Sequence, residues 1–276
     1  MKIAVLGNGI FGSAMASYLS KKRHEVVFDM IDNSEIIFVC STSNLVLSSL
    51  LKLQKEMTNQ KIIICSKGFA EEGKLISEVL KGNFKNEIFF LYGPTLAEEL
   101  EKGVPSSMVL AGGNGKEEIK KQIESKNLRV ELSDDVIGVE ISATLKNVMA
   151  LFIGIAQGAG YGQNTAAFVF TKAVQEVKNI GLALGGKVET FLGLTCVGDL
   201  FLSSRNRLFG IELGKGRKLD EISSETGHTP AGIFDLKNAQ RMVKKLDIKA
   251  PIIESLYKIV FENCPVRDTI KEIISN

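Results

Sequence analysis

The sequence contains few of the residues that build metal sites, disulfide frameworks and nucleic-acid surfaces. Its 276 residues include no tryptophan and only two histidines, too few for a histidine-rich metal cluster, so we expect no bound metal. The four cysteines are scattered without a pairing motif, which is typical of free thiols in a reducing cytoplasm. The net charge is only +2, and no basic stripe is interleaved with aromatic residues. Neither nucleic acid nor an anionic membrane is therefore an expected partner.

The sequence also offers no apolar run that we take as long enough to cross a bilayer, so we expect no membrane span. The N-terminal stretch MKIAVLGNG reaches glycine and asparagine too early for a signal peptide, and it fits a strand that enters a turn. A chain of this length, with ordinary fractions of apolar and charged residues, suits one large domain or two smaller ones. We expect a globular protein of the cytoplasm.

Short apolar runs alternate with helical segments over the first half of the chain, whereas helical runs dominate the second half. Strands are predicted for KIAVL, EVVFD, EIIFVCS, KIIICS, EIFFLYG, SSMVLAGG and LRVELS. This alternation predicts a doubly wound, Rossmann-like α/β domain with a parallel sheet over residues 1–133. An all-α domain is predicted over residues 134–276.

The connection between the second and third predicted strands is unusually short. Only DMIDNS separates the two runs. A parallel crossover through a helix needs about a dozen residues, whereas six extended residues reach about 20 Å and leave no room for a helix. A helix and a strand that usually lie at this point of the fold are therefore missing.

The segment GNGIFG places Gly7, Gly9 and Gly12 in the G-x-G-x-x-G spacing, between a predicted strand and a predicted helix. Asp29 ends the next strand at about the usual distance. In this context the spacing predicts a dinucleotide-binding turn, in which the glycines permit a tight turn, approach of the pyrophosphate and close helix packing. The helix N-terminus then faces the phosphate charge. A plain strand–turn–helix is the alternative.

Two further loops follow predicted strands. CSKGF places Lys67 after one strand, and GPTLAEE places Gly93, Thr95 and Ala97 after the next. Ligands of open α/β sheets bind outside the carboxyl ends of the strands, so we expect both loops to face the dinucleotide crevice. The alternative is that they are ordinary loops.

The segment VGDLFLSSRNRLFG combines Asp199 with a cluster of serine, arginine and asparagine residues. A guanidinium group is a planar fork that suits phosphate or carboxylate. With hydroxyl and amide donors beside it, Arg205 would form an anion clamp. A basic surface turn is the alternative.

Lys146 lies inside the apolar stretch EISATLKNVMALFIGIAQGAG. On a helix its neighbours three and four positions away are Ser142, Ala143, Met149 and Ala150, none of which is acidic. Desolvation lowers the pKa of a lysine in a core helix unless a partner offsets it. The alternative is that the side chain extends along its own stem to water.

Taken together, these segments resemble the NAD(P)-dependent glycerol-3-phosphate dehydrogenases over nearly the whole chain. The resemblance is carried by GNGIFG, SKGF, GPTLAEE, VPSS, DVIGVEISATLKNVMALFIGIAQGAGYGQNTAAF and GDL…SRNRLFG. It implies a cytoplasmic oxidoreductase that transfers a hydride between a nicotinamide cofactor and the small-molecule pair dihydroxyacetone phosphate and sn-glycerol 3-phosphate. Such an enzyme supplies glycerol phosphate for lipid synthesis, and a homodimer is one assembly that the resemblance allows.

The resemblance also implies roles for individual residues. Lys146 would transfer the proton, Asp199 would lie beside it, and Lys67 would contact both substrate and cofactor. Further substrate contacts are implied for Gly93, Thr95, Asp199, Ser204, Arg205 and Asn206. Cofactor contacts are implied for Gly7, Gly9, Ile10, Phe11, Gly12, Asp29, Lys67, Ala97, Arg205 and Glu225.

The chain departs from this family in the short connection after Asp29 and in a shorter segment between Asp199 and Arg205. The second departure leaves Ser203 and Ser204 as alternative substrate contacts. Because Asp29 can accept both ribose hydroxyls of NAD and no arginine or lysine follows in MIDNS, NAD(H) is favoured, with NADP(H) also compatible. Two other functions stay open: another two-domain hydroxyacid dehydrogenase or ketoacid reductase, and a catalytically silent dinucleotide-binding redox sensor.

Overall fold

The structure is a computed structural model that describes residues 1–275, and the side chain of Ser204 lies outside its described part. The chain forms two compact units, Met1–Glu140 and Ile141–Asn276. The division falls inside the long helix α6 (Val136–Gly158), whose first residue follows the sequence-based boundary by two positions.

The first unit is built on one seven-stranded sheet of order β2-β1-β3-β4-β5-β6-β7. Its strands are β1 (Lys2–Leu6), β2 (Glu25–Phe28), β3 (Ile36–Val39), β4 (Lys61–Ile64), β5 (Ile88–Tyr92), β6 (Ser106–Gly112) and β7 (Leu128–Ser133). All neighbouring pairs are parallel except β5 and β6, which are antiparallel. The predicted doubly wound, Rossmann-like sheet is thus confirmed, with one antiparallel pair that the sequence did not predict.

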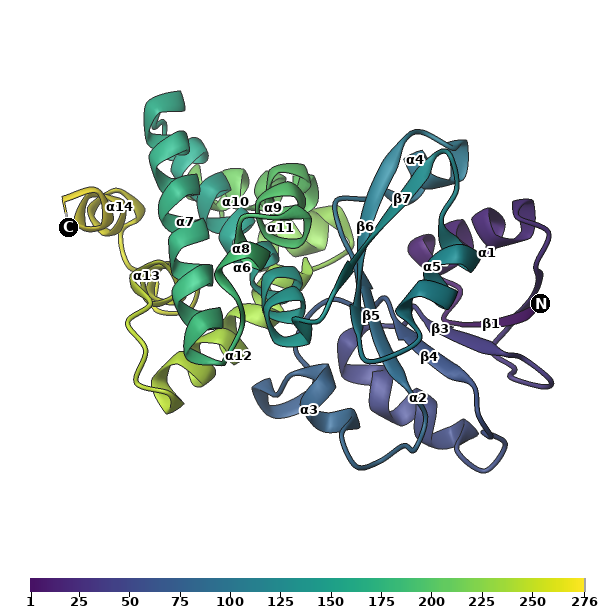
Figure 1. Cartoon of the computed structure of the whole chain (residues 1–276). Helices are drawn as coiled ribbons and strands as arrows, with labels where there is room; N and C mark the ends of the chain where they lie inside the picture. Colours follow the sequence, from purple (N-terminus) through teal and green to yellow (C-terminus); the bar gives the residue numbers. More distant parts are fainter. Residues whose placement is uncertain (276) are drawn as a thin grey trace. The chain divides into compact units, whose positions relative to one another are not determined.

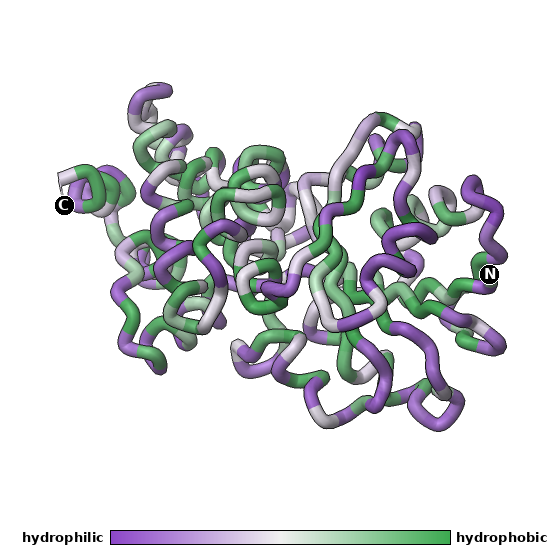
Figure 2. The backbone as a smooth tube through the Cα atoms, in the orientation of Figure 1, coloured by the Kyte–Doolittle hydropathy of each residue, from purple (hydrophilic) through white to green (hydrophobic). Residues whose placement is uncertain are grey.

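Helices cover both faces of this sheet (Figure 1). They are α1 (Ile10–Lys21), α2 (Val46–Leu53), α3 (Ile76–Leu80), α4 (Ala97–Lys102) and α5 (Lys116–Ile123), with short 3-10 turns at Ser43–Leu45 and Glu71–Gly73. Residues of α1, α4 and α5 share one core with alternate residues of the strands. Intervening strand residues such as Ile37 and Ile62 are also fully buried, so the strands read as continuous apolar runs. In Figure 2 the middle of the sheet is accordingly hydrophobic, while the connecting loops are largely hydrophilic.

The short connection predicted between the second and third strands leaves β2 at the edge of the sheet. The chain passes from Phe28 to Ile36 without a helix, and both Asp29 and Asn33 adopt left-handed backbone conformations with φ of 52°. Asparagine and aspartate tolerate this region better than other non-glycine residues, which explains how so few residues reverse the chain. No strand of the described chain pairs with the outer side of β2.

The second unit is helical. After the shared helix α6 it contains α7 (Gln163–Ala183), α8 (Val188–Phe191), a π-helical turn η3 (Leu194–Gly198), α9 (Asp199–Leu202), α10 (Ser204–Gly214), α11 (Leu219–Thr226), α12 (Ala231–Lys245), α13 (Pro251–Phe261) and α14 (Val266–Ser275). The predicted all-α character of this part of the chain is confirmed. Its helices surround α6, whose residues are almost all buried.

Helix α6 also corrects one sequence-based expectation. Its 23 residues are long and apolar enough to cross a membrane by length and composition, so such a run does exist in the sequence. Within the protein, however, 83% of its most apolar window is buried, as expected for the core helix of a globular protein. Among the described residues no other helix passes the same test.

Helices α6 and α10 approach one another at glycines. A Cβ atom at Gly154 would lie 2.1 Å from the carbonyl oxygen of Arg207, and one at Gly210 would lie 2.2 Å from that of Leu151. Any larger side chain at these points would separate the two backbones. The sequence therefore brings the start of α10 close to the middle of α6, which determines where the candidate site of this unit forms.

Candidate active site

The glycine turn of the first unit has the geometry that its spacing predicts. Gly7 follows β1 with φ of 99°, a conformation that a residue with a side chain rarely adopts. At Gly12, in the first turn of α1, a Cβ atom would lie 1.9 Å from the Gly7 carbonyl oxygen, so only glycine fits. Gly9 precedes α1, and nothing lies within 4 Å of the position of its missing Cβ. The turn thus leaves open space at the N-terminus of α1, which suits a pyrophosphate.

Of the two residues between Gly9 and Gly12, one side chain faces solvent and the other packs on the core. Ile10 is 65% exposed, whereas Phe11 is partly buried against the core beneath the sheet. Asp29 turns back toward the glycines, and the backbone N–H of Gly7 donates a 2.9 Å hydrogen bond to its Oδ1. The carboxylate that we expect at the cofactor ribose is therefore held at the turn.

A cavity of about 290 Å³ opens beside the turn, at the carboxyl ends of β1, β2 and β3. We call it the edge cavity; its lining is Leu6, Gly7, Asp29, Ser41, Ser49, Lys52 and Leu53. Three of these residues belong to α2 and were not predicted from the sequence. The only available signal was the spacing of Ser49 and Lys52, which places both on one face of a helix behind a strand end.

The loops after β4 and β5 meet, as expected for neighbouring parallel strands. The Lys67 ammonium donates a 3.0 Å hydrogen bond to the Gly93 carbonyl oxygen. Thr95 donates from its backbone N–H to the same carbonyl at 2.9 Å and from its hydroxyl to the Ser107 carbonyl at 3.2 Å. Ala97 begins α4 directly after this loop. One cation and one hydroxyl therefore lie together at the carboxyl edge of the sheet.

In the second unit, Lys146 of α6 forms an ion pair with Asp199. Its Nζ lies 2.9 Å from Asp199 Oδ1, and the two side chains are 13% and 4% exposed. Asp199 is the first residue of α9 and follows the π-helical turn η3. Such turns widen the helix and reorient the residues beside them. The partner that Lys146 lacks on its own helix is thus supplied by a residue 53 positions further along the chain.

The predicted anion clamp is only partly open to a ligand. Asn206 is buried; its Nδ2 donates to Asn147 Oδ1 at 3.0 Å, and its Oδ1 accepts from the Gly232 N–H at 3.0 Å. Ser203 donates its hydroxyl hydrogen to the Asp199 carbonyl oxygen at 3.0 Å. Arg205, by contrast, is exposed on the first turn of α10. Ser204 begins the same helix, and its side chain lies outside the described part of the structure.

Glu225 lies in the last turn of α11, where it forms an ion pair with Arg217. Its side chain is 65% exposed. No contact in the described chain links it to Arg205 or Lys146. Its cofactor role stays a prediction from the resemblance.

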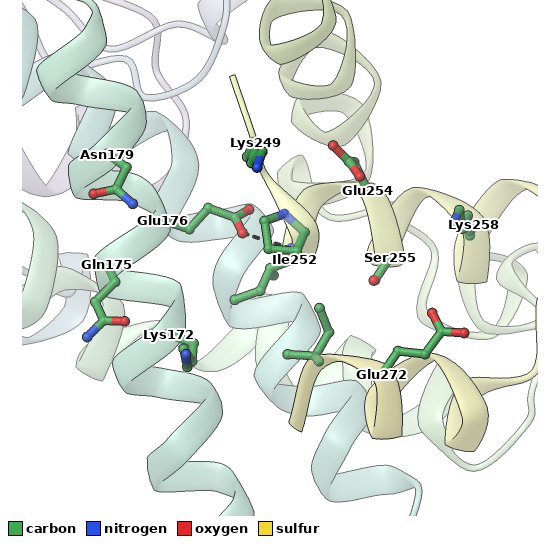
Figure 3. Close-up of a pocket in the computed structure, with 12 residues that line it drawn as sticks. Lys172, Gln175, Glu176, Asn179, Lys249, Ile252, Glu254, Ser255, Lys258 and Glu272 are labelled. Atoms are coloured by element: carbon green, nitrogen blue, oxygen red, sulfur yellow. Dashed lines mark hydrogen bonds between the residues drawn. The ribbon is translucent and has the colours of Figure 1, made fainter. Parts of the chain in front are cut away.

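A second hollow, of about 340 Å³, lies among α7, α13 and α14 (Figure 3). There Glu176 accepts hydrogen bonds from the backbone N–H groups of Ile252 and Ile253, at 2.8 and 3.0 Å. These amides belong to the first turn of α13, so the buried carboxylate caps that helix. Burial raises the pKa of Glu176 to about 7, although the two hydrogen bonds lower it. None of the predicted site residues lines this hollow, and its acid has a structural role.

Comparisons with known proteins identify the family of this chain. The family model described as the NAD-dependent glycerol-3-phosphate dehydrogenase N-terminus matches residues 27–118, and the one described as the C-terminus matches residues 135–271. The glycerol-3-phosphate dehydrogenase [NAD(P)+] of Thermoanaerobacter sp. is 33% identical over 95% of this chain and 93% of its own length. The glycerol-3-phosphate dehydrogenase [NAD(P)+] of Fusobacterium nucleatum is 31% identical over 99% of this chain and 96% of its own length.

The alignments run over 308 and 323 positions, more than the 276 residues of this chain, so these relatives carry residues that it lacks. Among solved structures, glycerol-3-phosphate dehydrogenase from Coxiella burnetii superposes with a TM-score of 0.93 at 24% identity and covers 100% of this chain and 99% of its own. That likeness establishes the shared fold. On the sequence relatives and the two matched models together, the chain belongs to the NAD-dependent glycerol-3-phosphate dehydrogenase family.

Proposed function

We propose that this chain reduces dihydroxyacetone phosphate to sn-glycerol 3-phosphate with a nicotinamide cofactor, and that Lys146 delivers the proton. The observation that carries the proposal is the buried ion pair between Lys146 and Asp199 in the segment that most resembles the family. Burying two charges between α6 and α9 costs desolvation free energy. Buried ionisable groups cluster at functional sites, so this pair favours a catalytic role. The product is the glycerol phosphate that lipid synthesis consumes.

The dinucleotide is assigned to the glycine turn because the residues present fit it. The space beside Gly9 and the N-terminus of α1 suit a pyrophosphate. When bound, the reduced cofactor supplies the hydride for the C2 carbonyl of the substrate. Lys67 and Thr95 at the carboxyl edge of the sheet are assigned to the substrate and the nicotinamide end.

The residues of the second unit would stabilise the charge that develops on the substrate and would supply the proton. As the carbonyl carbon is reduced, negative charge develops on its oxygen, and the Lys146 ammonium stabilises that charge and donates a proton to it. Asp199 holds the ammonium in place through the 2.9 Å contact. The exposed guanidinium of Arg205 is assigned to the substrate phosphate, which it can bind through two parallel hydrogen bonds.

Asn206 is assigned to positioning in this proposal. Both ends of its amide are engaged within the unit, although Nδ2 carries a second hydrogen that a phosphate oxygen can accept. The hydroxyl contact at the phosphate end is assigned to Ser204 on the resemblance alone. The resemblance implies a cytoplasmic enzyme and allows a homodimer, and light scattering of the purified chain tests the assembly.

The activity is tested by following NADH and NADPH oxidation spectrophotometrically with dihydroxyacetone phosphate. We expect turnover with this substrate and much less with α-ketoacids of similar size. A preference for carboxylated substrates would indicate a ketoacid reductase instead. Cofactor binding without turnover on any of these substrates would indicate a silent dinucleotide-binding protein.

Cofactor preference is a separate part of the proposal. Asp29, which accepts the Gly7 N–H, is assigned to the cofactor ribose, where its negative charge would oppose the 2′-phosphate of NADP. We expect kcat/KM to favour NADH by about tenfold, equivalent to about 1.4 kcal/mol, and Asp29→Asn to narrow that gap. Both values are measured at low ionic strength, because salt screens the repulsion between the exposed Asp29 carboxylate and the 2′-phosphate. Equal use of both cofactors by the unaltered chain would contradict the role given to Asp29.

A further inference from the structure

The edge cavity contains opposite charges at the end of the turn where NAD and NADP differ. Its lining includes one acidic residue, Asp29, and one basic residue, Lys52. We propose that Lys52 is a specificity-determining residue that contacts the 2′-phosphate of NADP(H), with the hydroxyl group of Ser49 beside it. This inference rests on the proposed dinucleotide-dependent function and names the residue that lets the chain accept the second cofactor.

The position of Lys52 follows from the geometry of α2. Ser49, Lys52 and Leu53 stand at positions i, i+3 and i+4, so they share one face of the helix, and all three line the cavity. Leu53 gives that face an apolar part that suits an adenine ring, whereas Ser49 and Lys52 give it donors. Ser41 lines the cavity from the loop after β3, but its hydroxyl oxygen is buried and does not face a ligand.

The short connection after β2 makes this cation necessary. A phosphate monoester carries between one and two negative charges near neutral pH and needs donors or cations around it. Residues 29–34, DMIDNS, contain two aspartates and no arginine or lysine. The relatives have additional residues that this chain lacks. In the described lining of the edge cavity, the ammonium of Lys52 is therefore the positive charge opposite Asp29.

Lys52 is also free to make this contact. Its side chain is exposed, and it takes part in none of the ion pairs found within residues 1–275. Asp29, by comparison, already accepts the Gly7 N–H on Oδ1. The two residues act in opposite directions: Asp29 sets the preference for NADH, and Lys52 limits how large that preference becomes.

The test compares Lys52→Met with Lys55→Met. Lys55 is an exposed lysine three positions further along that does not line the edge cavity. For Lys52→Met we expect kcat/KM with NADPH to fall about tenfold, as for the loss of one charge-assisted contact. With NADH, kcat/KM should change less than about twofold, because the adenosine ribose of NADH has no 2′-phosphate for Lys52 to contact. Lys55→Met should leave both values unchanged.

A binding experiment separates this inference from the proposed activity. Calorimetric titration with 2′,5′-ADP and with 5′-AMP needs no turnover, and Lys52→Met should weaken only the first ligand. If the chain does not turn over dihydroxyacetone phosphate, the proposed function is wrong. The titration still tests the role of Lys52 in that case, because it measures binding alone. Equal losses for both ligands, or no loss for either, would overturn the inference. Thermal melting of each variant checks that α2 is intact, because Lys52 lies in its last turn.

Discussion

At the scale of single residues, Lys146 and Asp199 are the pair on which the proposed chemistry depends. Lys146→Met keeps most of the side chain's apolar stem and removes its charge. We expect turnover to fall at least about a hundredfold, as for loss of a general acid, while NADH still binds. Single-turnover kinetics and cofactor titration measure the two effects separately.

The matched control for that variant is Lys244→Met, on the exposed surface of α12. It should retain the turnover of the unaltered chain. If Lys146→Met also retained it, Lys146 would have no part in the proton transfer. The buried carboxylate of Asp199 would then serve only to hold α9 against α6.

Arg205 permits a test of the phosphate end of the substrate. Removing a charge-assisted phosphate contact should weaken transition-state binding by about 2–4 kcal/mol. Arg205→Ala should therefore lower kcat/KM for dihydroxyacetone phosphate far more than for unphosphorylated dihydroxyacetone. Arg241→Ala, at an exposed position of α12, is the control. Equal losses on both substrates would show that Arg205 does not recognise the phosphate.

Sequence patterns predicted some of these residues but not their partners. They indicated that Lys146 has no acidic neighbour on its own helix, but the pairing with Asp199 came from the family resemblance, since a contact across 53 positions leaves no local trace. Patterns also placed Asn206 among the phosphate donors. The structure engages its amide with Asn147 and Gly232, contacts that depend on how α6, α10 and α12 pack.

At the scale of elements, the turn between β1 and α1 makes a prediction that distinguishes two glycines. Gly12→Ala would force a Cβ to within 1.9 Å of the Gly7 carbonyl oxygen, and we expect it to destabilise the fold by about 1–3 kcal/mol. Gly9→Ala meets no protein atom within 4 Å and has an ordinary φ of −68°, so it should melt like the unaltered chain.

Gly9→Ala should nevertheless bind NADH roughly tenfold or more weakly, because its methyl group occupies the space assigned to the pyrophosphate. Thermal melting and cofactor titration of both variants measure this contrast. Unchanged NADH affinity in a stable Gly9→Ala variant would mean that the pyrophosphate does not approach that position.

Most elements were predictable because each has a local signature. Strand runs such as KIIICS and the glycine turn are recognisable from patterning and spacing alone. The antiparallel pairing of β5 with β6 was not, since the direction of a strand depends on the path of the whole connection. The π-helical turn before Asp199 was missed for a similar reason: it depends on the packing of α9.

At the scale of the whole molecule, two buried acids make stability depend on pH. Burial raises the pKa of Glu140, in the first unit, and of Glu176, in the second, to about 7. Between about pH 4.5 and pH 7 the folded chain therefore binds more protons than the unfolded chain. The free energy of unfolding should then fall as pH rises through this window, by an order of about 3 kcal/mol for each acid.

Urea titrations between pH 4.5 and pH 8 measure this slope. Glu176→Gln should flatten it, although the amide keeps only one acceptor for the two N–H groups of α13 and lowers stability at acidic pH. Glu262→Gln, at the exposed C-terminal end of the same helix, is the control. A slope that stayed the same in Glu176→Gln would show that this carboxyl is already ionised at pH 5.

The family resemblance that the sequence carries is confirmed, and with it the reading of the chain as an NAD(P)-dependent glycerol-3-phosphate dehydrogenase. The alternative functions are not favoured. The short connection after Phe28 was also visible in the sequence as a missing crossover. Its consequence, a cavity shared by Asp29 and a face of α2, was not, because it depends on segments that meet only in the folded sheet.

The position of β2 at the edge of the sheet has a consequence for isotope exchange. The amides of Glu25 and Asp29 donate to the carbonyl oxygens of Met1, just before β1, and of Val5, on β1. Since successive peptide groups of a strand point to opposite sides, the amides of Val26 and Phe28 face away from β1 and are left to water. Deuterium will therefore enter the sheet at these two amides well before it reaches β1, which is bonded on both sides. A ligand held by Asp29 will slow that entry only at the last residue of the strand.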